Sequence, residues 1–100
     1  MFTDLEGFTK LSHAISPERL SALLNRYLDV LSNVVLEHGG TIDKFVGDAV
    51  VAFWGAPIPR EDDGDRAARA AIAMFEAGEE FRRTAGDDVP PIGCTRVGLH

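Results

Sequence analysis

Residues 39–54, GGTIDKFVGDAVVAFW, decide how this chain folds. Two apolar runs flank the pair Gly47-Asp48, which suits a tight turn because glycine accepts a positive φ. The pattern predicts a hairpin with strands over 41–46 and 49–54, and the second strand, apolar on both faces, is expected inside the sheet. Turn chemistry alone explains a carboxylate at this tip, and a binding site is the competing interpretation.

A second segment carrying an aspartate stands at the start of the chain. Residues 1–5 are expected to end a strand in which Phe2 and Leu5 pack, and Gly7 separates this strand from a short helix over 8–14. A strand that feeds a glycine turn and a helix directs backbone N–H groups toward whatever lies above the end of the strand.

The sequence also predicts a long helix that begins at Ser16-Pro17-Glu18. Apolar residues recur at three- and four-residue spacing from Leu20 to Val35 and indicate one buried stripe. The helix ends at His38-Gly39-Gly40, so we interpret His38 as a helix-end residue rather than a ligand.

The last part of the chain predicts a loop over 55–59, a helix over roughly 65–83, a loop over 84–92 and a strand over 93–100 that contains Arg96. Because the chain stops on that strand, we expect a domain cut short at its C-terminal end. The inner face of the predicted helix is expected to consist of small and aromatic residues, namely Ala67, Ala68, Ala71, Ile72, Phe75 and Phe81.

The predicted order is strand, short helix, long helix, hairpin, helix, strand. It indicates an α+β sandwich with helices packed on an antiparallel sheet, close to the ferredoxin-like or palm-like arrangement. In such a sheet the first strand ends beside the tip of the hairpin, so Asp4 and Asp48 are expected to face one another.

Composition limits the function. The 100 residues carry a net charge of −6 and form no basic stripe, which argues against nucleic acid as a partner. No apolar run reaches the roughly 20 residues of a membrane-spanning helix, and the start does not resemble a signal peptide. With the single cysteine, Cys94, no internal disulfide can form, so we expect a cytoplasmic location, either free or as part of a membrane-anchored protein.

Two facing carboxylates bind Mg²⁺ readily, and two shared ions can hold a triphosphate for in-line displacement. Lys44 precedes Asp48 by four residues, so strand alternation places it on the metal side if no bulge intervenes. The bland interpretation of Lys44 is a solvated strand lysine. For Arg96 the bland interpretation is a surface partner of the acidic cluster 61–65.

Three segments resemble the class III nucleotidyl cyclases, the adenylate and guanylate cyclases, in the same order and with similar spacing. They are FTDLEGFT at 2–9, IDKFVGDAV at 42–50 and RVGLH at 96–100. The resemblance covers the N-terminal part of the catalytic domain, as residues 1–100. It implies an enzyme that converts ATP to 3′,5′-cyclic AMP and pyrophosphate in intracellular signalling.

The resemblance also implies roles for individual residues. Asp4 and Asp48 would be the side-chain ligands of two Mg²⁺ or Mn²⁺ ions, and Leu5 would add its backbone carbonyl. Lys44 would read the purine as adenine, where guanylate cyclases usually carry glutamate. The phosphates would be bound by Gly7, Phe8, Thr9 and Arg96.

The family's sites form between two catalytic domains, and this chain resembles one that works as a homodimer. A second purine reader, an asparagine that orients the ribose and an arginine that stabilises the transition state would lie beyond His100. We therefore expect the 100-residue chain alone to be inactive, and a sensor or membrane domain can precede it in the parent protein.

Two alternatives stay open. A diguanylate cyclase also places metals on a first strand and a hairpin tip, but its turn reads Gly-Gly-Asp/Glu-Glu-Phe, whereas this turn is Val46-Gly47-Asp48-Ala49. A degenerate cyclase-homology module for dimerisation or nucleotide sensing usually lacks a metal aspartate or the lysine, and both are present here.

Overall fold

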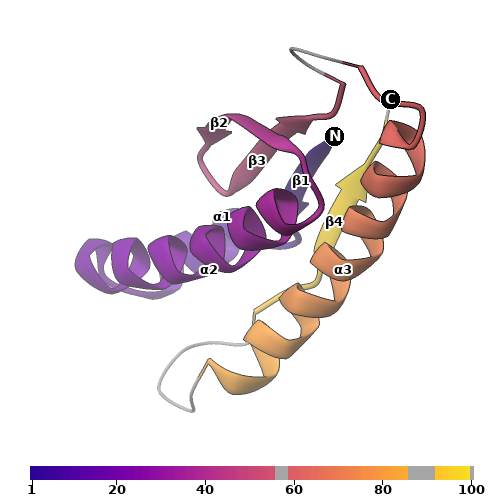
Figure 1. The fold of residues 1–100 in the computed structure, drawn as a ribbon. Coiled ribbons are helices and arrows are strands. Elements are labelled where there is room, and N and C mark those ends of the chain that lie inside the picture. The colour runs from indigo at the N-terminus through magenta and orange to yellow at the C-terminus, as the bar shows by residue number, and fades with distance from the viewer. Residues whose placement is uncertain (56–58, 86–91, 100) are drawn as a thin grey trace.

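The computed structural model describes residues 1–55, 59–85 and 92–99. These residues form the predicted order of elements (Figure 1). Parts of the loops predicted over 55–59 and 84–92 fall outside the described residues, as does His100. The elements are β1 (Phe2–Leu5), α1 (Phe8–Ala14), α2 (Pro17–Glu37), β2 (Thr41–Val46), β3 (Ala49–Phe53), α3 (Asp63–Thr84) and β4 (Thr95–Gly98).

The four strands form one antiparallel sheet in the order β2-β3-β1-β4. The strand β1 therefore lies between the hairpin and β4, and the strand predicted to be internal, β3, has a neighbour on each side. This topology confirms the predicted α+β fold with an antiparallel sheet and helices packed on it.

The sheet has two different faces. The helices α2 and α3 pack on one face, where Thr3, Val50 and Thr95 are almost completely buried (Figure 1). Residues on the opposite face, here called the open face, follow from the register. Phe2 pairs with Val51, Asp4 pairs with Arg96, and Lys44 pairs with Val51. Because paired residues share a face, Asp4, Lys44 and Arg96 all project from the open face.

The packing predicted for Phe2 is wrong. Leu5 is 5% exposed in the core, whereas Phe2 is 43% exposed on the open face. The two residues are three positions apart, so a strand must turn their side chains to opposite faces.

The hairpin contains one irregularity. The register shifts between Ile42 and Lys44, which leaves Asp43 without a partner in β3. This bulge precedes Lys44, so the alternation from Lys44 to the turn is intact and Lys44 lies on the predicted face.

The long helix α2 is as predicted. The Oγ of Ser16 accepts a hydrogen bond from the Arg19 N–H at 3.3 Å, and the apolar stripe buries Leu23, Tyr27, Leu31 and Val35. At the other end, His38 Nδ1 lies 2.8 Å from the Val34 carbonyl, and Trp54 Nε1 donates to the His38 carbonyl at 2.9 Å. His38 is therefore a helix-end residue.

The predicted inner face of α3 is wrong by about one position. Ala68 is exposed, and Ile72 and Phe75 are 63% and 47% exposed. Of the predicted set, Phe81 is buried, and it shares the inner face with Ala70, Met74 and Gly78. Gly78 sets this rotation, since a Cβ at that position would overlap the side chain of Thr95. Within the described ranges, no helix has the length and apolar character needed to cross a membrane.

Candidate active site

One open pocket of about 250 Å³ gathers residues from four parts of the chain. The end of β1, the start of α1, the β2–β3 turn and β4 meet there. Its lining is the predicted site without Lys44: Asp4, Leu5, Gly7, Phe8, Thr9, Asp48 and Arg96.

Asp48 connects the hairpin tip to the end of β1. Its Oδ2 accepts a hydrogen bond of 2.6 Å from the Leu5 backbone N–H. Gly47 has a φ of 60°, the left-handed conformation that the turn requires, and it delivers Asp48 to this position. Asp4 and Asp48, 44 positions apart, therefore lie in the same pocket, as predicted.

Asp4 is bound by Arg96 on the neighbouring strand. The Nε of Arg96 donates to Asp4 Oδ1 at 2.6 Å, and this hydrogen bond raises the pKa of Arg96 further above its high ordinary value. The bland interpretation of Arg96, a partner of the acidic cluster 61–65, is wrong. Within that cluster Asp62 and Asp63 contact Arg66 instead.

The turn between β1 and α1 presents its backbone to the pocket. Leu5 as a whole residue is only 5% exposed, and it lines the pocket at the end of β1. Gly7 has a φ of 73° and precedes α1, and its carbonyl accepts the first helical hydrogen bond from Leu11 N–H at 3.0 Å. A left-handed residue at a turn is one of the backbone features from which anion-binding concavities are built.

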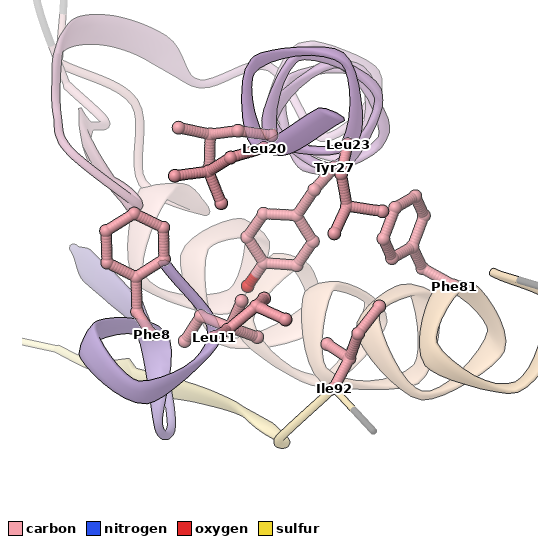
Figure 2. Close-up of a pocket in the computed structure, with 9 residues that line it drawn as sticks. Phe8, Leu11, Leu20, Leu23, Tyr27, Phe81 and Ile92 are labelled. Atoms are coloured by element: carbon pink, nitrogen blue, oxygen red, sulfur yellow. The ribbon is translucent and has the colours of Figure 1, made fainter. Parts of the chain in front are cut away.

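The core holds this turn in place. Leu5 and Phe8 also line a small apolar cavity between α1, α2 and α3, together with Leu11, Leu23, Tyr27 and Phe81 (Figure 2). Its volume of about 10 Å³ is at the lower limit of the space that one water molecule needs, and apart from the Tyr27 hydroxyl, which pairs with Thr95, the lining side chains are apolar. The cavity is therefore a packing feature, and it shares Leu5 and Phe8 with the open pocket.

Lys44 lies outside the pocket. Its side chain is 63% exposed, and its Nζ lies 3.8 Å from Asp43 Oδ2. The structure thus places Lys44 on the same face as Asp4 without bringing it into contact with the pocket residues.

Sequence reasoning assigned Tyr27 to the core but missed its link to the site. Its hydroxyl lies 2.7 Å from Thr95 Oγ1, on the strand that carries Arg96. Burial raises the pKa of Tyr27 to about 12, the bond with Thr95 partly offsets this, and the nearby charges of Asp48 and Asp4 add to it. No local pattern reveals this contact, because it joins residues 68 positions apart.

We expect the absorbance of tyrosinate to appear near pH 12 in the folded chain and near pH 10 in urea. Because the unfolded state loses this proton first, stability should be constant below the unfolded pKa and fall by about 2–3 kcal/mol as the pH rises toward 12. Tyr27 is the single tyrosine, so the spectrum reports on it directly. If Tyr27→Phe shows the same loss of stability above pH 10, Tyr27 is not the cause.

The pocket chemistry fits a divalent cation. Its ligating groups are two carboxylates and backbone carbonyls, which are the hard oxygen donors that Mg²⁺ and Mn²⁺ prefer. Asp48 keeps Oδ1 and Asp4 keeps Oδ2 outside the two hydrogen bonds described above. The described residues contain no group of three or more histidine, cysteine or acidic side chains placed to hold a metal, so a cation here would depend on these two carboxylates.

The comparisons with known proteins agree with this geometry. Residues 1–100 match the family model of the adenylate and guanylate cyclase catalytic domain. The chain is 41% identical over 100 residues to adenylate cyclase 1 of Rhizobium meliloti, covering all of this chain and 15% of that protein.

Two solved structures show the same fold. The guanylyl cyclase Cya2 superposes with a TM-score of 0.84 at 36% identity, over 91% of this chain and 47% of that one. The adenylyl cyclase CyaB from P. aeruginosa gives 0.81 at 41% identity, over 89% of this chain and 48% of that one. The chain thus spans about half the length of these solved cyclase chains, and it belongs to the adenylate and guanylate cyclase catalytic domain family.

Proposed function

We propose that residues 1–100 form the metal- and phosphate-binding part of an enzyme that converts ATP to 3′,5′-cyclic AMP and pyrophosphate. The observation that carries this proposal is the single pocket in which Asp4, Asp48 and the β1–α1 turn meet. The alternative, a degenerate module, is not favoured, because both aspartates and Lys44 are present.

In this proposal Asp4, Asp48 and the Leu5 carbonyl hold two Mg²⁺ or Mn²⁺ ions. When bound, such ions lower the pKa of the ribose 3′-hydroxyl and stabilise the leaving pyrophosphate. Asp48 is oriented for this task by the Leu5 N–H. The backbone of Gly7, Phe8 and Thr9 supplies N–H groups to the phosphates.

We further propose that the site is completed by a second copy of the chain. The open face carries exposed apolar side chains, with Phe2 at 43%, Val46 at 56% and Phe53 at 38% exposure. Lys44 projects from the same face outside the pocket. Among the similar solved structures are a non-canonical dimeric guanylyl cyclase domain from Blastocladiella emersonii, which was also solved as a monomer, and a guanylate cyclase domain from Catenaria anguillulae in complex with GTP.

The whole protein is proposed to act in the cytoplasm, either free or as the cytoplasmic part of a membrane-anchored protein. Because residues 1–100 span about half of the solved cyclase chains, we propose that they do not turn over ATP alone. Cyclic nucleotide made by the 100-residue chain above the level of its Asp48→Ala variant would contradict this.

The test incubates the whole protein with ATP or GTP and Mg²⁺ or Mn²⁺, and identifies the product by chromatography and mass spectrometry. A 3′,5′-cyclic mononucleotide is expected. A cyclic dinucleotide would indicate a diguanylate cyclase, and metal-dependent ATP binding without turnover would indicate the sensing module.

Lys44 is the residue that we propose to read the purine. An ammonium donor matches the N1 acceptor of adenine, whereas a carboxylate accepts the N1–H and N2–H of guanine. We expect Lys44→Glu to lower the ratio of kcat/KM for ATP to that for GTP by about tenfold or more. Lys10→Glu makes the same change of charge on α1 and should leave the ratio unchanged. If the ratio of kcat/KM for ATP to that for GTP is the same in the wild type and in Lys44→Glu, Lys44 does not recognise the purine.

A further inference from the structure

The ion pair between Arg96 and Asp4 is built into the sheet. The two residues stand directly opposite one another in the β1–β4 register, and Arg96 Nε donates to Asp4 Oδ1 at 2.6 Å. Cross-strand neighbours of opposite charge pair in this way without any help from loops. One of the two carboxylates that we assign to the metals is thus already bound to a cation of the protein.

Arg96 can leave Asp4 without disturbing the core. Its side chain is 60% exposed, and that of Asp4 is 33% exposed. Both line the open pocket, so solvent and ions reach the pair directly. The negative charge of Glu6 also attracts Arg96.

We propose that Arg96 is a counter-ion that the divalent cation displaces. It neutralises Asp4 while the site is free of metal, releases it when Mg²⁺ or Mn²⁺ binds, and then stands at the pocket rim ready to bind phosphate. Arg96 is therefore a positioning residue that competes with the metal. The inference rests on the proposed function, because it takes Asp4 as a metal ligand.

The proposal predicts a spectroscopic change in Arg96. In protein labelled with ¹⁵N-arginine, the Nε–H signal of Arg96 should lie away from the position of a solvated arginine in the absence of metal, since this group donates to Asp4. Arg96→Lys assigns the signal by its loss. Saturating Mg²⁺ should move the signal to the position of a solvated arginine, in parallel with a shift of the Leu5 amide, which donates to Asp48.

It also predicts a change in metal affinity. Free Mn²⁺ measured by electron paramagnetic resonance gives the Kd without any enzymatic assay. A partly exposed ion pair contributes only modestly, so we expect Arg96→Gln to bind Mn²⁺ about threefold to tenfold more tightly than the wild type. Lys10→Gln removes the same charge from exposed α1, next to Thr9, and should change the Kd by less than about twofold.

The outcomes separate the two proposals. If Mg²⁺ shifts the Leu5 amide but leaves the Arg96 signal unchanged, and Arg96→Gln behaves like Lys10→Gln, the metal site stands and the counter-ion role is wrong. If Mg²⁺ shifts neither signal and Mn²⁺ does not bind, the proposed metal site fails and the counter-ion role fails with it.

Discussion

Asp48→Asn is expected to lower kcat for cyclic nucleotide formation by the whole protein about 10³-fold or more. The substitution removes the negative charge of the Asp48 carboxylate, which we propose to bind the metal ions. It keeps a carbonyl oxygen in the place of Oδ2, so the hydrogen bond from the Leu5 N–H can persist and the β2–β3 turn should keep its shape. Initial rates with Mg²⁺ and with Mn²⁺ measure the effect.

A matched control is Asp29→Asn, which makes the same chemical change at an exposed position of α2. It should leave kcat within about twofold of the wild type, because exposed substitutions away from a site have small effects. If Asp48→Asn stays within tenfold of the wild type while its urea unfolding is unchanged, Asp48 does not hold the catalytic metals.

The part of the site that the sequence could predict is the part set by local rules. Gly47 requires a turn, and the turn fixes where Asp48 stands in the hairpin. Gly7 likewise separates β1 from α1 and fixes the backbone around Phe8 and Thr9. Once the order of elements indicates a ferredoxin-like sheet, the ends of β1 and the hairpin must be neighbours, and the structure places Asp4 and Asp48 in one pocket.

The contacts of Arg96 and Tyr27 could not be predicted in this way. Both depend on β4, whose pairing with β1 joins residues about 90 positions apart. Alternation indicated that Arg96 lies in a strand, but it does not say which strand lies beside it or in which register. The non-functional interpretation of Arg96 named the acidic cluster 61–65 as its partner, and the structure shows Asp4 instead.

The rotation of α3 was the other failure, and it has a physical cause. Alanine and glycine fill much of this helix, so its apolar periodicity is weak and Ile72 and Phe75 dominate the pattern. The structure instead turns the smallest residue toward the sheet. The close packing of α3 on β4 at Gly78 is therefore favoured over the burial of Ile72 and Phe75.

This close approach predicts that Gly78→Ala destabilises the chain by about 2–3 kcal/mol. In an ordinary helix interior the same substitution stabilises by up to about 1 kcal/mol. Here a Cβ would lie 2.8 Å from the Thr95 Cβ and still nearer to its Oγ1, which bonds the Tyr27 hydroxyl. Either α3 moves away from β4, or Thr95 turns and leaves a buried hydroxyl without its partner. Urea unfolding of the 100-residue chain, followed by the fluorescence of Trp54, measures the change.

Gly64→Ala provides the control in the same helix, since a Cβ there meets nothing within 4 Å. It should be neutral or stabilise by up to about 1 kcal/mol. The contact itself is tested in a Thr95→Ala background, where the Oγ1 is gone and Gly78→Ala should cost about 1 kcal/mol less than in the wild type. An equal cost in both backgrounds would show that the Thr95 Oγ1 is not what excludes a side chain at position 78. A reduced cost would establish that the absence of a side chain at Gly78 lets α3 pack closely against β4, the strand that carries Arg96.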